Sequence, residues 1–334
     1  MLPPKNLRLA VGVPLALIVS LGVVTPGQAK DPKPLGERAY GYIEALTRIE
    51  NPDGTFTRVL RTQGTIGEVR AATSIQGWFD KSGYRAKRQK FTYVAKGKKH
   101  SSQNVVAVRK GRATKADPSR PLVILGAHYD ARREGWGADD NASGVAVMLE
   151  VAHRMRNVKT SYDLKFVAFG AEEMPAAERG SEHFAASLSK RDIKRAAVMI
   201  NYDSLIVGDH MYVHAGFNKK TWARDRMVRL SKKFRLPIDT QPGWNPAYPA
   251  GLTPNGLSDY SSFNRAGIPI VAFESTNWEI GDLDGYTQTE QFGSFWHTSQ
   301  DSLQTIEERY PDRPRVHLFT FTKLTMTFLK SLKG

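Results

Sequence analysis

The pattern of apolar and polar residues predicts buried strands that alternate with amphipathic helices along most of the chain. Short continuous apolar runs, typical of strands covered on both faces, occur at 121–126, 164–169, 197–200, 211–214 and 268–273. The patterns that predict helices occur at 36–49, 65–79, 145–155, 181–188, 221–234, 259–265 and 315–332. Such alternation is typical of a mostly parallel sheet between helix layers. We therefore expect an α/β fold with a mixed, mostly parallel central sheet sandwiched between helices.

Three further segments refine this expectation. Residues 91–94 and 104–108 read as strands separated by a charged turn at 96–102. The predicted helix at 65–79 begins with Thr65 and has Glu68 three residues later, which is the pattern of a capping box. Residues 241–258 are rich in proline and glycine and are predicted to form a long loop and a pocket wall. Because no change of composition marks a boundary, residues 30–334 are predicted to form a single domain.

The first 29 residues have the three parts of a secretory signal peptide. Basic residues near the start are followed by an apolar stretch at 9–24 and by the small-residue ending Gly27-Gln28-Ala29. An uncleaved membrane anchor is the alternative, but the apolar stretch is short and is interrupted by Gly12, Pro14 and Gly22. We expect cleavage after Ala29 and an exported protein, periplasmic or extracellular, without a stable membrane anchor.

Charge and cysteine content narrow the classes of function. The formal net charge is +15, but the basic residues are spread along the chain rather than gathered in one stripe, so we expect no nucleic-acid partner. The sequence has no cysteine, which excludes disulfides, thiolate metal ligands and a cysteine nucleophile. Any bound metal must therefore be held by histidine and carboxylate side chains.

The stretch from Gly126 to Gly144 carries the first candidate metal ligands. His128 and Asp130 follow a predicted buried strand, at the sheet edge where open α/β folds bind ligands. An isolated His-x-Asp is more often an ordinary hydrogen-bonded loop, but here Asp139 and Asp140 follow at a loop-to-helix junction. We expect one of these two acids to be a helix cap and the other to belong to the site. Asp130 is expected to accept the second imidazole N–H of His128.

Four more candidates follow other predicted strands, and each would reach the same edge of the sheet. They are Glu172, Glu173, Asp203 and His297. Two histidines and several carboxylates suit zinc, with manganese or cobalt as substitutes. Because a single catalytic zinc normally uses three protein ligands, a set of five ligands, two histidines and three carboxylates, favours two ions that share a bridging carboxylate.

The order of these motifs resembles the co-catalytic zinc aminopeptidases of peptidase family M28. The motifs are His-x-Asp, Asp-Asn-Ala-Ser-Gly, Glu-Glu, Asn-Tyr-Asp and His-Thr-x-x-Asp, at 128–130, 140–144, 172–173, 201–203 and 297–301. The segments 201–209, 276–278 and 284–286 are similar to the bacterial alkaline phosphatase isozyme-conversion aminopeptidases of this family. The resemblance extends over most of the chain after the predicted signal peptide.

The resemblance implies a role for each candidate. Asp140 would bridge two zinc ions, with His128 and Asp203 completing one site and Glu173 and His297 the other. Glu172 would be the general base that binds no metal. Asp130 and Asp301 would support the ligands without binding metal themselves. The resemblance also implies a cis peptide bond between Asp140 and Asn141. Tyr248, Tyr260 and Tyr286 are candidates for an oxyanion-stabilising group, because Trp296 stands before His297 where some relatives place a tyrosine nearby.

These roles predict an aminopeptidase that acts on peptide or protein N-termini, and they leave three alternatives. The first is a glutaminyl cyclase, which shares the fold and ligand order but uses one zinc. The second is a carboxypeptidase, which needs a cationic side chain to bind the substrate carboxylate. The third is a non-catalytic envelope-binding protein, which needs no general base.

The acidic segment 274–290 contains no lysine or arginine in an otherwise basic chain. It is either a solvated loop or a wall that binds a cationic substrate side chain, arginine above lysine, with Asp282 and Asp284 as candidates.

Overall fold

The structure is a computed structural model that describes residues 33–113, 120–173, 175 and 177–332. The predicted signal peptide lies outside these residues and stays a prediction. Within the described ranges, no helix combines the length and the apolar character needed to cross a membrane. The elements described below all belong to the unit formed by residues 31–334.

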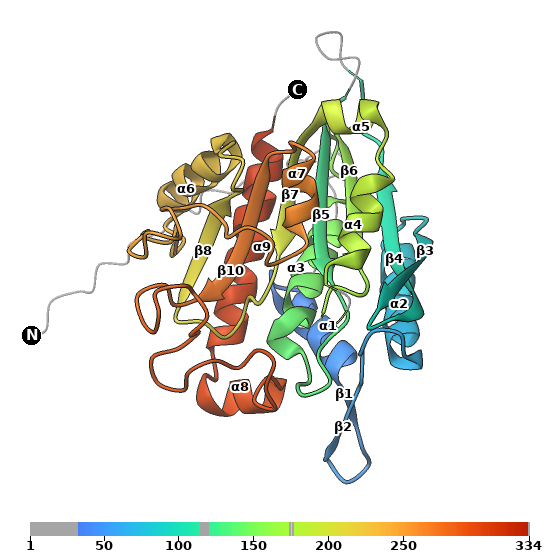
Figure 1. Ribbon diagram of the computed structural model, residues 1–334, viewed down its shortest axis with the longest axis vertical. Helices are drawn as coiled ribbons and strands as arrows, with labels where there is room; N and C mark the ends of the chain where they lie inside the picture. Colours follow the sequence, from blue (N-terminus) through green and yellow to red (C-terminus); the bar gives the residue numbers. More distant parts are fainter. Residues whose placement is uncertain (1–32, 114–119, 174, 176, 333–334) are drawn as a thin grey trace, which may run out of the picture. The chain divides into compact units, whose positions relative to one another are not determined.

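A central sheet of eight strands has the order β3-β4-β6-β5-β7-β10-β8-β9 (Figure 1). Strands β6, β5, β7 and β10 run parallel to one another. Strands β3 and β4 pair antiparallel with each other, and β4 pairs antiparallel with β6. Strand β8 pairs antiparallel with β10 and parallel with β9. A separate small sheet pairs β1 with β2. The strands are β1 Arg48–Glu50, β2 Phe56–Arg58, β3 Lys87–Ala95, β4 Lys98–Arg109, β5 Leu122–His128, β6 Asp163–Phe169, β7 Ala196–Tyr202, β8 His210–Ala215, β9 Ile238–Asp239 and β10 Ile270–Thr276. The mixed, mostly parallel sheet is confirmed.

The continuous apolar runs are explained by burial on both faces of the four parallel strands. In β5, Val123 and Leu125 belong to one apolar cluster, while Leu122 and Ile124 belong to another on the opposite face. Since successive side chains of a strand point to opposite faces, a strand covered on both sides needs apolar residues at every position. All seven residues of β5 are buried, including its last residue, His128.

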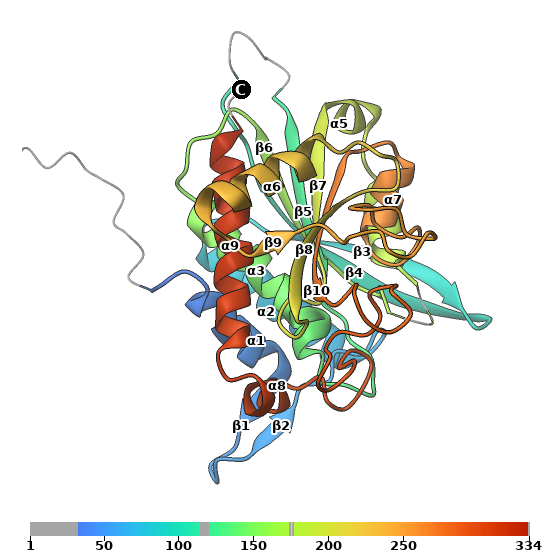
Figure 2. The same cartoon turned by 90° about the vertical axis from the view of Figure 1, so that its left-hand side faces the viewer.

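Helices cover both faces of the sheet (Figures 1 and 2). One layer contains α1, α2, α3, α6 and α9, and the opposite layer contains α4, α5 and α7. The helices are α1 Glu37–Thr47, α2 Ile66–Lys81, α3 Gly144–Met155, α4 Arg179–Ala186, α5 Lys190–Arg195, α6 Trp222–Phe234, α7 Tyr260–Arg265, α8 Leu303–Arg309 and α9 Arg313–Ser331. A π-helical turn, Ala138–Ser143, leads into α3. The predicted sandwich of sheet and helices is confirmed.

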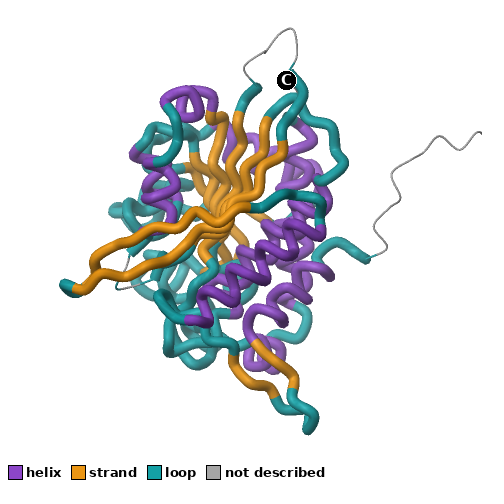
Figure 3. Tube along the Cα trace, turned by 90° about the vertical axis from the view of Figure 1, so that its right-hand side faces the viewer, coloured by secondary structure: helices purple, strands orange, loops and turns teal. Residues whose placement is uncertain are grey.

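The hairpin of β3 and β4 is longer than the sequence predicted and reaches out from the body of the sheet (Figure 3). Lys98 and Lys99 pair with Ala95 and Val94, so most of the charged segment expected to be a turn is strand. Charged side chains are tolerated there because residues 98–104 of β4 lie beyond the part that pairs with β6 and pair with the edge strand β3 alone.

Two local expectations were incomplete. The Thr65 hydroxyl caps α2 by accepting from the Glu68 N–H, as predicted, but the Glu68 carboxylate accepts from the N–H of Gly64 instead of that of Thr65. The short elements β1, β2, β9, α5 and α8 were not predicted, because so few residues show no clear periodicity.

His317 joins helix α9 to the loop that follows β7. Its buried Nδ1 lies 3.1 Å from the carbonyl oxygen of Leu205 and 3.2 Å from the hydroxyl of Ser275. Burial, together with the charge of nearby Arg313, lowers the pKa of His317 to about 3. The folded chain therefore keeps this imidazole neutral at pH values where the unfolded chain protonates it. This contribution to stability is present above the ordinary histidine pKa and is lost as the pH falls toward 3.

We expect that lowering the pH from 7 to 5 reduces the free energy of unfolding of the wild type by about 2 kcal/mol more than that of His317→Gln. The variant lacks the imidazole that is neutral in the folded chain and protonated in the unfolded chain. Urea unfolding in the presence of a chelator measures this difference. The exposed variant His210→Gln should behave like the wild type. Equal pH dependence in the wild type and His317→Gln would contradict the assignment.

Candidate metal centre

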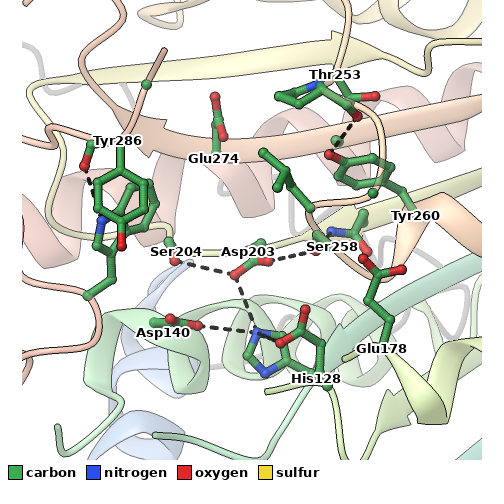
Figure 4. Close-up of a pocket in the computed structure, with 18 of the residues that line it drawn as sticks. His128, Asp140, Glu178, Asp203, Ser204, Thr253, Ser258, Tyr260, Glu274 and Tyr286 are labelled. Carbon is green, nitrogen blue, oxygen red and sulfur yellow. Dashed lines mark hydrogen bonds and ion pairs between the residues drawn. The ribbon is translucent and has the colours of Figure 1, made fainter. Parts of the chain in front are cut away.

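The predicted ligands meet at the carboxyl ends of the parallel strands (Figure 4). His128 is the last residue of β5, and Asp203 directly follows β7. Glu173 lies in the turn after β6, and Asp140 lies in the π-helical turn before α3. His297 comes from the loop between β10 and α8. The structure thus brings together side chains that are up to 169 residues apart in the sequence, as the sequence analysis expected.

Asp140 is shared between two groups of potential ligand atoms. One group is His128, Asp140 and Asp203, and the other is Asp140, Glu173 and His297. Oδ1 of Asp140 lies 3.2 Å from Nε2 of His128, while Oδ2 lies 3.2 Å from Nε2 of His297. Asp203 Oδ1 is 3.5 Å from His128 Nε2, and Glu173 Oε2 is 3.4 Å from His297 Nε2. Each oxygen of one carboxylate therefore faces a separate group, which is the geometry of a bridge.

The electrostatics of both groups favour a bound cation. Burial alone would raise the pKa of Asp140, but hydrogen bonds to His128 and His297 hold it well below its ordinary value. Hydrogen bonds to Asp140 and Glu173 raise the pKa of His297 to about 10. In the metal-free chain, protons on the imidazoles therefore balance the carboxylates. Since a metal needs neutral imidazole, binding a divalent cation would release those protons.

The residues present fit zinc. Imidazole nitrogen and carboxylate oxygen are zinc ligands, and each group offers three of them. Oε1 of Glu173 is buried and has no hydrogen-bond partner among the described residues. A buried carboxylate oxygen without a partner is costly, and a metal ion would satisfy it.

Glu172 stands beside the first group without belonging to either. Its Oε2 lies 3.9 Å from His128 Nε2. Burial raises the pKa of Glu172 well above its ordinary value. Glu172 therefore has the properties of a general base. It lies close to the candidate metal site, its pKa is raised, and it is not needed as a ligand.

Asp130 supports the site differently from the prediction. Its carboxylate is 3.8 Å from His128 Nδ1, too far for the expected hydrogen bond, and Nδ1 instead lies 3.2 Å from the Asp130 carbonyl oxygen. The carboxylate accepts from the N–H groups of Glu172, at 3.0 and 3.1 Å, and of Glu173, at 3.1 Å. Asp130 therefore fixes the turn that carries both glutamates.

Asp139 is not the helix cap that the sequence suggested. The π-helical turn and α3 both begin without a side-chain cap, and Asp139 is buried. Its carboxylate accepts from the Ile206 N–H at 2.7 Å and from Gln288 Nε2 at 2.6 Å. Asp139 thus ties the loop after β7 to the segment before His297. An acid at a predicted helix start can instead bond to distant loops, which local sequence does not reveal.

Asp301 holds the backbone of the bridging residue. Its carboxylate accepts from the N–H of Asp139 at 2.6 Å and from the N–H of Asp140 at 3.1 Å. The peptide bond between Asp140 and Asn141 is cis, as the resemblance implied.

Three contributors were missed by the sequence analysis. The Ser258 hydroxyl donates to Asp203 Oδ2 at 2.7 Å. Gln288 Oε1 accepts from the N–H groups of Phe295 and Trp296, next to His297. The buried Arg61 donates to the carbonyl oxygens of Leu46, Tyr129, Trp136 and Gly137. None of the three belongs to a recognisable motif, so no local signal marked them.

The ligand groups open into a cavity of about 380 Å³. The predicted loop 241–258 supplies part of its wall. Asp284 lines the cavity, but Asp282 is exposed and is not among the lining residues. Tyr260 and Tyr286 line it as well, whereas Tyr248 does not. The Tyr260 hydroxyl donates to the Pro254 carbonyl oxygen at 3.0 Å. Of the three candidate tyrosines, Tyr286 is therefore the one best placed to contact a substrate.

Comparison with known sequences identifies a family and curated relatives. The model of peptidase family M28 matches residues 104–316. The chain is 32% identical to the alkaline phosphatase isozyme conversion protein of Escherichia coli K12, over 95% of this chain and 96% of the relative. It is 31% identical to aminopeptidase YwaD of Bacillus subtilis 168, over 62% of this chain and 41% of that protein.

Solved structures share the fold at low sequence identity. BSAP, a zinc aminopeptidase from Bacillus subtilis, aligns with a TM-score of 0.68 at 18% identity, over 91% of this chain and 98% of the other. A glutaminyl cyclase from Tannerella forsythia aligns with a TM-score of 0.63 at 19% identity, over 89% and 99% of the two chains.

We expect Asp130→Asn to lower the free energy of unfolding of the metal-free chain by about 1–3 kcal/mol. Both oxygens of Asp130 accept from backbone N–H groups, whereas an asparagine side chain has one oxygen that can accept and an NH₂ group that cannot. Urea unfolding in the presence of a chelator measures the change. The exposed Asp282→Asn should shift stability by less than about 0.5 kcal/mol. If the two variants were equally stable, the amide contacts of Asp130 would not hold the turn.

Proposed function

The chain belongs to peptidase family M28, and from this premise we propose that it is an exported aminopeptidase that uses two zinc ions to remove N-terminal residues, arginine in particular, from peptides or proteins. Its aminopeptidase relatives and the zinc aminopeptidases of the same fold support the enzyme class and the metal. The pattern of residues 1–29 supports export.

The observation that carries this proposal is the shared position of Asp140. One carboxylate placed 3.2 Å from each of two histidines, with Asp203 completing one group and Glu173 the other, offers ligands to two ions side by side. Zinc bound there would supply Lewis-acid polarisation of the peptide carbonyl and of an attacking water.

The side chains of the chain itself would manage the protons. Glu172 would accept a proton from the water at Oε2 and deliver it to the nitrogen of the departing peptide. Asp130 would keep Glu172 in place through its backbone N–H. Asp203 would be kept in place by the hydroxyl of Ser258. No serine, cysteine or threonine nucleophile is needed in this scheme.

The charge of the cavity supports selection of N-termini. Besides the candidate ligands and Glu172, its lining includes the acids Glu178, Glu274 and Asp284, and Arg132 is the sole arginine or lysine among the lining residues of the described chain. Such a cavity attracts a protonated α-amine and also a cationic first side chain. Arginine is favoured over lysine because its planar guanidinium binds a carboxylate through two hydrogen bonds.

The alternative activities are less well supported. A glutaminyl cyclase uses one zinc, whereas the two ligand groups here favour two ions. A carboxypeptidase needs a cation beside the substrate carboxylate, and Arg132 Nη1 is instead 4.0 Å from Glu173 Oε2. A non-catalytic binding protein has no use for the poised Glu172.

We expect a chelator to abolish hydrolysis of aminoacyl anilides by the purified protein and zinc or cobalt to restore it. Metal analysis of the active enzyme should give about two ions per chain. Full activity without metal would rule out the proposed mechanism, and one ion per chain together with release of ammonia from glutaminyl peptides would favour the cyclase.

We expect Glu172→Gln to lower kcat by about a hundredfold or more while the metal content stays unchanged, because it removes the general base and no ligand. In contrast, Asp140→Asn should lose metal, because it weakens both groups at once. Kinetics and metal analysis of the two variants check the roles. Loss of metal in Glu172→Gln with retention in Asp140→Asn would reverse them.

A further inference from the structure

Glu274 lies next to the candidate metal ligand Asp203 at the edge of the sheet. The N–H of Asp203 donates to the carbonyl oxygen of Phe273 at 3.2 Å, and the N–H of Ser275 donates to that of Ser204 at 2.8 Å. Glu274, between Phe273 and Ser275 on β10, is therefore one strand away from Asp203. It is part of a regular strand and lines the same cavity (Figure 4).

Two buried side chains fix the carboxylate of Glu274. Its Oε1 accepts from the indole N–H of Trp278 and lies 2.7 Å from Nε2 of the buried His214. Nδ1 of His214 is buried and has no hydrogen-bond partner in the described chain. The hydrogen of a neutral imidazole therefore belongs on Nε2, because an unpartnered acceptor costs less than an unpartnered N–H. Both donors thus act on Oε1, and no side chain among the described residues donates a hydrogen bond to Oε2.

The chain builds a support for Trp278 as well. Gly285 has φ +77°, and a Cβ at this position would lie 2.5 Å from an atom of the Trp278 ring. The loop of residues 279–286 can therefore lie against the indole only with glycine at 285. Trp278 and Tyr286 both line the cavity and give it aromatic surface beside Glu274, which suits a guanidinium.

The carboxylate of Glu274 forms no ion pair with an arginine or lysine of the described residues. Its contact with His214 is a hydrogen bond from the imidazole N–H. The other acids of the cavity are less suited to this role. Burial raises the pKa of Glu178 to about 7. Asp284 is held by the N–H of Tyr286, two residues away in the same loop, rather than by two buried side chains.

We propose that Glu274 is the residue that selects a cationic first side chain of the substrate, with its free Oε2 facing a guanidinium. The inference rests on the proposed aminopeptidase function and narrows the sequence-based expectation, in which one or more carboxylates of the segment 274–290 face the cationic side chain, with Asp282 and Asp284 as candidates. Asp282 is exposed and Asp284 lines the cavity from a loop, whereas Glu274 is held by a strand and two buried donors.

The test is kcat/KM of the zinc-loaded enzyme for arginyl, lysyl and leucyl anilides in the wild type and in Glu274→Gln. Glutamine keeps an acceptor for His214 and Trp278 but removes the charge. We expect kcat/KM for the arginyl substrate to fall about tenfold to a hundredfold, mainly through KM, because a hydrogen bond to a charged group is lost. The leucyl value should stay within roughly threefold, because no group at the metal ions changes.

Glu279→Gln is the matched control, because Glu279 belongs to the same acidic segment but is exposed and does not line this cavity. It should keep the wild-type preference for arginine. Glu274→Asp is a second variant that keeps the charge but withdraws it by one methylene, and it should lose part of the preference. This variant keeps the inference testable if Glu274→Gln does not fold.

Two results would overturn the inference. Equal loss for the arginyl and leucyl substrates would mean that Glu274 only supports the fold. Loss of the preference in Asp284→Asn or Glu178→Gln, with Glu274→Gln unchanged, would assign selection to another acid. Both differ from failure of the proposed function, in which the zinc-loaded wild type would hydrolyse none of the anilides.

Discussion

The burial of many carboxylates at one edge of a sheet is the constraint on which the rest of this structure depends. Uncompensated charges inside a protein cost several kcal/mol each, so every acid needs a partner. Asp140 is offset by two histidines, whereas Asp130 and Asp301 accept from backbone N–H groups. These hydrogen bonds do two things at once, because each lowers the cost of a buried charge and fixes a loop that carries a ligand.

Arg61 adds a permanent positive charge beneath this acidic cluster. Burial lowers its pKa to about 10, so it is still charged at neutral pH. It donates hydrogen bonds to backbone carbonyl oxygens at the end of α1, after β5 and in the loop before Asp140. These hydrogen bonds connect three segments that must be correctly placed relative to one another for the site to form. Its charge also favours the ionised form of the nearby carboxyl groups of Asp301, Asp130 and Asp140.

The parts of the site that sequence could predict are those tied to periodic elements. His128 and Asp203 end or follow buried strands, and the apolar runs before them predict both the strand and the edge that it reaches. The roles of Asp139 and Ser258 could not be predicted, because their partners come from loops that are distant in sequence. The length of β4 was underestimated for a different reason, since its residues 98–104 pair with the edge strand β3 alone and need no apolar side chains on faces exposed to solvent.

The same division separates the candidate metal ligands from the outer wall of the cavity. The candidate ligands and Glu172 are placed by strands and by hydrogen bonds to backbone N–H groups, which leave little freedom of movement. The outer wall of the cavity comes from the segments 241–258 and 284–286, whose side chains can change without moving the sheet. Ser258 is the exception, because it belongs to this wall and also holds Asp203. A change in the wall near Ser258 would therefore alter metal binding as well as the shape of the cavity, whereas a change of the Tyr286 side chain would leave the hydrogen bond between Ser258 and Asp203 in place.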